Sequence, residues 1–203
     1  MHPYPHQHLN VEDLTATRPG RLRATWQAAH QPAAGVSRRM RLAAYAVPLA
    51  VLPSSIWRLP AAFDDGIALG ERAYVLSLSI VSELFAFTAI GLIARWGEVF
   101  PGWVPFLRGR RVPTMAGVIP AAIGATTLIL LFTLLFSVAE IRGTTIRGAE
   151  LPDSYPSRAG GWEAAWFYLC YAPLILWGPL LAVLTVAYWQ RRRNGRSAEV
   201  GPK

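Results

Sequence analysis

The sequence predicts an all-α membrane protein with four transmembrane helices and both termini in the cytoplasm. Of its 203 residues, 53% are hydrophobic and only 16% are charged, and the apolar residues gather in long blocks. One block, residues 73–94, contains a single charge, Glu83, and would extend roughly 33 Å as a helix, enough to cross a hydrocarbon core of about 30 Å. Most Lys and Arg residues lie in the two terminal regions and in the connection between the second and third apolar blocks, as expected when these segments share one side of a membrane.

Residues 1–39 precede the first block and are expected to form a basic, disordered cytoplasmic tail. His2, His6 and His8 lie near its start. Flexible histidines without a supporting carboxylate are usually solvated, so no metal site is predicted. No secretory signal is expected either, because this stretch lacks an apolar core followed by a small-residue cleavage site.

The predicted transmembrane domain covers residues 40–190, and its first span, residues 42–57, is short. Pro48 and Pro53 interrupt it, while Arg41 and Arg58 can extend it by snorkelling to the membrane surface. A re-entrant hairpin is the rival interpretation. It would leave the six arginines of the N-terminal region outside the cell, so a full crossing is preferred.

The second span, residues 73–94, has apolar side chains on every side of a helical wheel, so it offers no polar face to water. Each apolar residue favours insertion by about 0.3–0.6 kcal/mol, whereas one carboxylate at the centre costs roughly 3 kcal/mol. The sum favours insertion despite Glu83.

The third and fourth spans, residues 114–139 and 164–189, carry small side chains at helical spacing. Such stripes allow two helices to approach closely. The small residues expected at helix contacts are Gly117, Ala121, Gly124, Gly178 and Ala182. Prolines inside these spans are expected to serve packing and kinks. Residues 191–203 are expected to form a second basic cytoplasmic tail.

The distribution of charge sets the predicted orientation. Fifteen of the twenty Lys and Arg lie in the two terminal regions and the connection 95–111, whereas seven acidic residues lie in the two other loops. The positive-inside rule then places both termini in the cytoplasm and the protein in the cytoplasmic (plasma) membrane. The connection 95–111 is expected to lie on the lipid surface and contact anionic headgroups, rather than nucleic acid. Its residues expected at that surface are Trp96, Trp103, Arg108, Arg110 and Arg111.

Three runs carry a resemblance, RWGEVFPGWVP, LRGRRVP and YAPLILWGPLLAVLTVAYWQRRR. They are similar to parts of small, uncharacterised four-helix integral membrane proteins of high-GC bacteria. The resemblance implies the four spans and their connections, and it brings no activity or functional residue set with it.

Glu83 is the strongest candidate for a functional residue. On a helical wheel it shares an arc of about 100° with Ser79 and Ser82, opposite a purely apolar face. The other polar groups expected at its depth are Thr127, Tyr171 and Trp177. Intramembrane carboxyls mark proton and ion pathways, but they also hydrogen-bond neighbouring helices. A transport site usually needs more polar groups than these, so the structural role is preferred.

No catalytic motif appears. The sequence has no metalloprotease, nucleophile-elbow or Walker signature, and its one cysteine, Cys170, permits neither an intramolecular disulfide nor a cysteine metal cluster. We therefore expect a non-enzymatic accessory or assembly subunit without a cofactor, whose partners are the bilayer and other membrane proteins or further copies of itself. The alternative is a small transporter or channel subunit that uses Glu83 as a proton or cation relay.

Overall fold

The computed structural model describes residues 31, 33–64, 66–100, 109–145, 147–153, 155–158 and 160–199, and within these the chain folds into helices without a β-strand. Its elements are α2 (Arg38–Ala62), α3 (Leu69–Gly91), α4 (Thr114–Leu128), a π-helical segment (Ile129–Phe136), α5 (Ser137–Arg142), α6 (Gly161–Tyr171), a 3₁₀ turn (Ala172–Leu176) and α7 (Trp177–Glu199). Four continuous rods are long and apolar enough to cross a membrane: Arg38–Pro60, Leu69–Gly91, Thr114–Arg142 and Gly161–Gly195. The predicted all-α fold with four candidate spans is confirmed.

The helices extend beyond the predicted spans, except that α3 ends at Gly91, three residues before the predicted end of the second span. Ser37 caps α2, accepting a hydrogen bond from the Met40 amide at 3.3 Å, and the helix continues through its prolines to Ala62. It therefore includes Arg58, which the sequence interpretation placed beyond the span. The last rod continues well beyond residue 189, so the predicted C-terminal tail is helical through Glu199.

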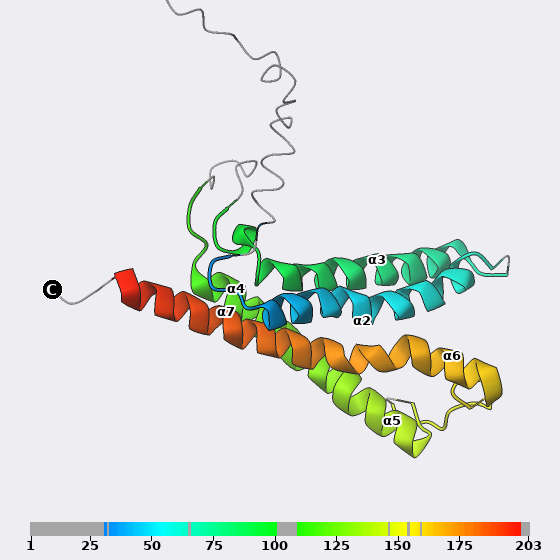
Figure 1. The fold of residues 1–203 in the computed structure, drawn as a ribbon. Coiled ribbons are helices and arrows are strands. Elements are labelled where there is room, and N and C mark those ends of the chain that lie inside the picture. Colours follow the sequence, from blue (N-terminus) through cyan, green and yellow to red (C-terminus); the bar gives the residue numbers. More distant parts are fainter. Residues whose placement is uncertain are drawn as a thin grey trace, which may run out of the picture.

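The four rods form two antiparallel pairs. In Figure 1, α2 lies beside α3, and the rod from α4 to α5 lies beside the rod from α6 to α7. Helix α2 also packs on α7, so it joins the two pairs, and the buried core lies along this contact. Val47, Val51 and Leu184 are fully or almost fully buried there. The two pairs diverge toward α6, and α3 packs mainly on α2.

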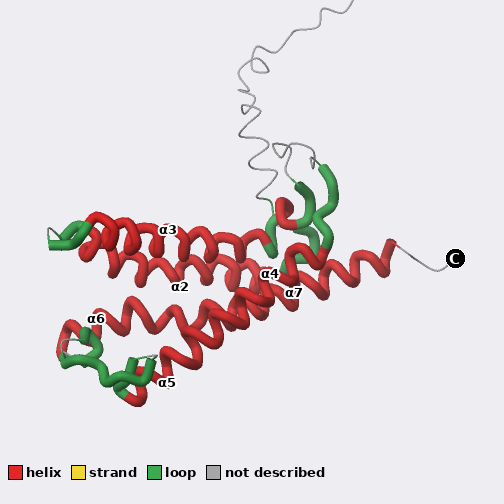
Figure 2. The backbone as a smooth tube through the Cα atoms, turned by 180° about the vertical axis from the view of Figure 1, so that it is seen from behind, coloured by secondary structure: helices red, strands yellow, loops and turns green. Residues whose placement is uncertain are grey.

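The connections gather at two opposite ends of the helices (Figure 2). At one end the chain before α2, the connection after α3 and the last turns of α7 come together. Ala33 donates a backbone hydrogen bond to Ile93 at 2.8 Å, and Val112 donates one to Glu98 at 2.8 Å. The loops 63–68 and 143–160 lie at the other end. The beginning and the end of the helical region therefore share one end, which we call the basic end.

The rod from α4 to α5 and the rod from α6 to α7 approach closely through glycine. A Cβ atom on Gly178 would lie 2.6 Å from the backbone nitrogen of Ile129, and one on Gly117 would lie 3.2 Å from the Tyr188 ring. At Gly124 the same atom would meet Leu181 at an ordinary 3.7 Å. Gly117 and Gly124 of the third span thus face the fourth rod, and Gly178 of the fourth span faces the third.

A proline and a threonine are linked across this contact. Pro179 has no amide hydrogen, so the carbonyl of Ile175 four residues earlier loses its helical donor. Thr133, in the π-helical segment of the facing rod, donates its hydroxyl to that carbonyl at 2.9 Å. The break in the fourth span is therefore satisfied by a side chain from the third, as proline inside a membrane helix requires.

Candidate functional site

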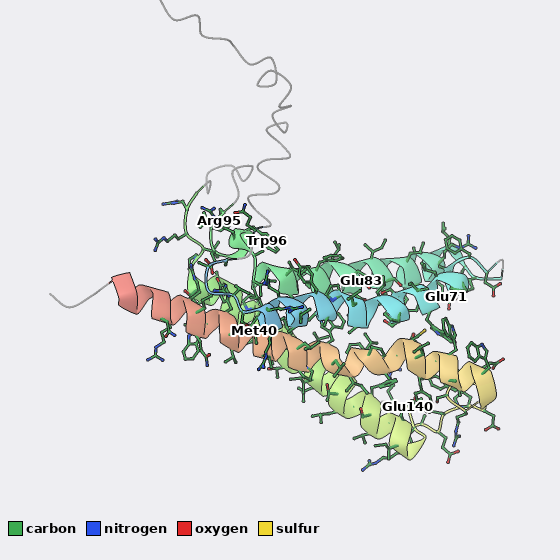
Figure 3. All side chains as sticks on the ribbon, in the orientation of Figure 1. Met40, Glu71, Glu83, Arg95, Trp96 and Glu140 are labelled. Carbon is green, nitrogen blue, oxygen red and sulfur yellow. The ribbon has the colours of Figure 1, made fainter. Side chains whose placement is uncertain are left out.

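A polar layer lies between α2 and α3 in the middle of the helix pair. We use this name for Ser54, Ser55, Arg58, Ser79, Ser82 and Glu83. The spacing of three or four residues within each helix places these side chains on one face, and the antiparallel pairing brings the two faces together. Figure 3 shows Glu83 about halfway along α3, with Glu71 toward the end opposite the basic end. We call this opposite end, where the loops 63–68 and 143–160 lie, the loop end.

Arg58 is the centre of this layer. Its Nε donates to the Ser79 hydroxyl at 3.3 Å, and its Nη2 approaches the Ser55 hydroxyl at 3.4 Å. The side chain is partly buried, and the two serines that it contacts are almost fully buried. Arg58 therefore reaches into the helix contact instead of snorkelling to the membrane surface.

Glu83 lies one turn along α3 from Ser79 and is partly buried. Its carboxyl interacts with the Ser55 hydroxyl and, electrostatically, with the guanidinium of Arg58. The oxygen Oε1 is nevertheless buried without a hydrogen-bond partner. A carboxyl with one unpaired buried oxygen and a cation nearby can accept a proton or a hydrogen-bond donor.

The serines of the layer serve their own helices as well. The Ser54 hydroxyl donates to the Val51 carbonyl at 2.8 Å, and the Ser79 hydroxyl donates to the Val75 carbonyl at 3.0 Å. Ser82 donates to the Leu78 carbonyl. Their donor hydrogens are thus directed to the backbone, and the lone pairs of the Ser79 oxygen remain to accept from Arg58.

Tyr171 extends the layer toward the loop end. It lies at the end of α6, where its hydroxyl interacts with Arg58, and its ring stacks on Phe167 with centroids 4.7 Å apart. Phe136 also stacks against Tyr171, with centroids 6.4 Å apart, and completes a cluster of three rings. The structure therefore brings three of the predicted site residues, Glu83, Ser79 and Tyr171, around one guanidinium.

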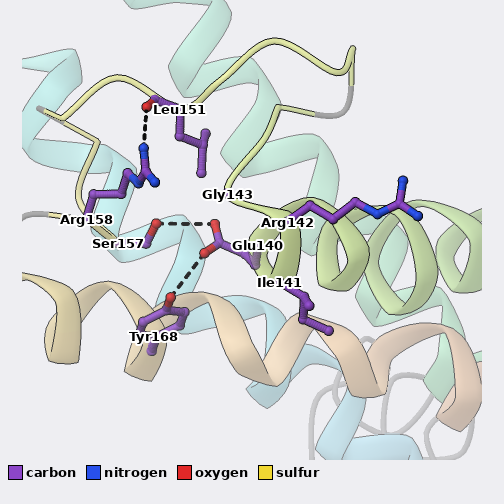
Figure 4. A pocket seen from close by; sticks show the side chains of 8 residues that line it. All are labelled: Glu140, Ile141, Arg142, Gly143, Leu151, Ser157, Arg158 and Tyr168. Atoms are coloured by element: carbon purple, nitrogen blue, oxygen red, sulfur yellow. Dashed lines mark hydrogen bonds between the residues drawn. The ribbon is translucent and has the colours of Figure 1, made fainter.

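A second polar cluster lies beyond this aromatic group, in the loop after α5 (Figure 4). The Glu140 carboxylate accepts from the Ser157 hydroxyl at 3.4 Å and from the Tyr168 hydroxyl at 3.1 Å, beside a cleft of about 420 Å³. Arg158 donates to the Leu151 carbonyl at 3.0 Å on the opposite wall. These bonds tie the loop and α6 to Glu140 of α5, and they leave a polar cleft at the surface.

Tyr155 lies between the two clusters. Burial, and then the nearby Glu140 carboxylate, raise the pKa of its phenol, and the hydroxyls of Tyr171 and Tyr168 contribute in the same direction. Titratable groups thus follow one another from Glu83 through Arg58 and Tyr171 to Glu140 at the loop end. On the other side of Glu83, toward the basic end, lie the buried apolar side chains of Ala86 and Ala89.

Two other predicted site residues lie elsewhere. Thr127 is exposed on α4, and Trp177 is buried at the start of α7, where its ring stacks on Phe132 at 6.0 Å. Both line an apolar groove between α3 and α4, whereas the polar partners of Glu83 come from α2. Trp177 Nε1 is buried without a hydrogen-bond partner.

At the basic end, the predicted lipid-surface residues Trp96, Arg110 and Arg111 are described, while Trp103 and Arg108 lie outside the described residues. Trp96 follows α3 in a 3₁₀ turn, beside Arg95 (Figure 3). Residues 98–100 form backbone hydrogen bonds with residues 110–112, so the two ends of this connection lie side by side where they leave the helices.

Arg191 of α7 ties the connection to the helices. It forms an ion pair with Glu98 at 2.8 Å and donates to the Leu92 carbonyl at 3.0 Å. Tyr188, one turn earlier, donates to the Gly97 carbonyl at 3.0 Å. The sequence predicted Arg191 only as part of a basic cytoplasmic tail, and its role in tying this connection to α7 was missed.

Sequence reasoning also missed Arg58 and Ser55. The signal was available as two complementary patterns, serine-serine-arginine in residues 54–58 and serine-serine-glutamate in residues 79–83. When the two helices form an antiparallel hairpin, these two patterns lie at the same depth and face each other.

Among the described residues, no three His, Cys, Asp or Glu side chains come together as metal ligands. Compared with known protein families, curated proteins and solved structures, the chain matches none of them. The candidate site is therefore defined by its own geometry, as a polar layer inside a multi-pass helical membrane protein.

Proposed function

We propose that this protein is a non-enzymatic accessory or assembly protein of the cytoplasmic membrane, with both termini in the cytoplasm, in which Glu83 joins helices by hydrogen bonding. The observation that carries the role of Glu83 is that it lies beside Ser55 and Arg58 of α2, and that Arg58 is itself hydrogen-bonded to Ser79 of α3. Because α3 packs mainly on α2, this layer fixes its rotation and position.

The outer face of α3 supports an assembly role. Only 17% of its most apolar stretch is buried within the chain, against 39% for the first and last rods and 6% for the third. Leu84, Phe85 and Phe87 of α3 are exposed. The polar layer therefore sets which apolar side chains α3 presents to the surrounding membrane and to any helix within it.

Affinity purification from native membranes in mild detergent tests this proposal. Wild type is compared with Glu83→Gln and with Glu71→Gln, a matched change at an exposed position of the same helix. We expect a defined partner to be retained by wild type and by Glu71→Gln and to be lost from Glu83→Gln. Recovery of the same proteins with all three variants would contradict the role of Glu83 in assembly.

A double-mutant cycle with Arg58→Met and Glu83→Gln tests the layer itself. Because interhelical polar contacts in membrane proteins contribute about 0.6–1.7 kcal/mol, we expect a coupling of about 1 kcal/mol in the free energy of unfolding in micelles. Strictly additive losses would show that the two side chains act independently.

Cysteine labelling tests the orientation. In a Cys170→Ala background, Asp153→Cys is expected to react with an impermeant maleimide in intact cells, and Asn194→Cys only after lysis. Both parent residues are exposed, so access is decided by the side of the membrane. Labelling of the Asn194 variant in intact cells would reverse the proposed topology.

One observation favours a relay as the second candidate. Oε1 of Glu83 is buried without a partner, and polar groups lead from it to the loop end but not to the basic end. This arrangement supports proton access from one side through Tyr171. In liposomes, a relay predicts proton flux in wild type that Glu83→Gln abolishes and Tyr171→Phe slows. Equal flux in wild type and Glu83→Gln would exclude it.

A further inference from the structure

An apolar groove of about 830 Å³ lies between α3 and α4, with α7 as its floor. Phe85, Leu92, Ala121 and Leu181 are among its lining residues. It extends from Trp177, near the start of α7, to Trp96 and Tyr188 at the basic end. Its length along the helices and its apolar walls suit a hydrocarbon chain aligned with the membrane normal.

A second cavity, of about 610 Å³, lies at the basic end and is lined by three arginines, Arg111, Arg191 and Arg192. Val112 lines both the groove and this cavity, so the two are adjacent. The cavity also contains Glu98, but Arg191 already pairs with that carboxylate at 2.8 Å. With this pair neutral, Arg192 leaves a positive charge in the cavity.

Arg192 is the residue in this cavity with unused hydrogen-bonding capacity. Its Nη2 donates to the Val112 carbonyl, whereas its Nε is buried without a hydrogen-bond partner. A buried, unpaired donor is costly and leaves the charge of this guanidinium poorly compensated within the chain. A phosphate in the cavity that Arg192 lines would compensate it, because arginine pairs with phosphate in charge-assisted bonds.

We propose that the groove and the arginine cavity together bind one anionic phospholipid, with an acyl chain between α3 and α4 and the phosphate at Arg192. A positively charged cavity next to an apolar groove is complementary to the anionic headgroup and the acyl chain of one molecule. A free phosphate would use only the cavity, and an apolar partner helix would fill the groove but leave the Arg192 guanidinium without an anion. This lipid site is independent of Glu83 and goes beyond the proposed function.

Native mass spectrometry of the full-length protein in mild detergent tests the site. The probes are phosphatidylglycerol, phosphatidylcholine with the same acyl chains, and inorganic phosphate. We expect phosphatidylglycerol to bind at least about fivefold more tightly than phosphatidylcholine, and Arg192→Gln to reduce that preference by about fivefold, the effect of one basic residue near an anionic headgroup.

Two further variants separate the groove from the cavity. Thr127→Phe places a ring in the groove from an exposed position, so it should weaken binding of both lipids without disturbing the fold. Arg39→Gln changes an exposed arginine outside both cavities and should leave binding unchanged.

Three results would overturn the proposal. Equal affinity for the two lipids would remove the role of the arginines, and tight binding of inorganic phosphate alone would define a soluble-anion site. A co-purifying protein or second copy that excludes lipid and is displaced by Thr127→Phe would assign the groove to a helix. Because none of these variants touches the polar layer, failure here leaves the role of Glu83 untouched.

Discussion

The close contact between the third and fourth rods predicts a graded response to replacing glycine with alanine. At Gly178 the added Cβ would meet the backbone nitrogen of Ile129 at 2.6 Å, and no rotamer change can relieve a clash with backbone. Overpacking of this kind costs about 1–3 kcal/mol, and we expect the upper half of that range. The better helix propensity of alanine returns up to about 1 kcal/mol, which leaves a net loss of about 1–2 kcal/mol.

Three other glycines provide comparisons for the loss expected at Gly178. At Gly117 the Tyr188 ring lies 3.2 Å from the added atom and must shift by a few tenths of an ångström, so a smaller loss is expected. At Gly124 the contact is an ordinary 3.7 Å, and at Gly195 nothing lies within 4 Å. Alanine at these two positions should be neutral or slightly stabilising, and Gly195→Ala is the matched control on α7.

Equilibrium unfolding in mixed detergent and dodecyl sulfate micelles, followed by circular dichroism, measures these four free energies of unfolding. The expected order of loss is Gly178, then Gly117, then Gly124 and Gly195 together. If Gly178→Ala is as stable as Gly195→Ala, the two rods do not touch at this point and the reasoning is refuted.

Three further predictions concern the two ends of the molecule. Glu98→Gln removes the charge from a partly exposed ion pair with Arg191, so about 1 kcal/mol of unfolding free energy should be lost. High salt should lower the stability of wild type toward that of the variant. An unfolding midpoint that is the same in both proteins at low salt would contradict this prediction. Burial, and then Glu140, raise the pKa of Tyr155, so the neutral phenol stabilises the fold below a pH of about 10, and this contribution disappears as the pH rises through the folded pKa. The free energy of unfolding of Tyr155→Phe should therefore fall less steeply than that of wild type as the pH rises above about 10. Parallel curves of unfolding free energy against pH would disprove the coupling. Tyr168→Phe removes the 3.1 Å bond to Glu140, and the loop after α5 should be cut by trypsin several-fold faster than in wild type; equal rates would mean that the bond does not restrain the loop.

Much of the fold followed from apolar blocks and charge. The four rods lie where the blocks predicted them, because span length and composition are properties of each segment alone. The ends were less predictable. Arg58 was placed outside the first span because the apolar block ends at Trp57, yet the helix continues to Ala62 and carries the guanidinium into the helix contact.

The candidate site depended on which helices pair, and the depth of each residue within its own span does not decide that. Matching residues by depth placed Thr127 beside Glu83, but α3 packs on α2, and the partners of Glu83 are Ser55 and Arg58. Depth is encoded along one segment, whereas the choice of neighbour depends on the packing of all four. The π-helical segment Ile129–Phe136 was not predicted either, because its residues are ordinary helix formers and membrane apolars.

The bond between Thr133 and the Ile175 carbonyl has a genetic consequence. Thr133 is needed only because Pro179 withholds the amide that would otherwise occupy that carbonyl, so the two positions are epistatic. Thr133→Val alone orphans a carbonyl inside the membrane, whereas the same change combined with Pro179→Ala restores a donor from the helix itself. Mutational paths that remove the proline first are therefore open, and paths that remove the threonine first pass through a destabilised intermediate.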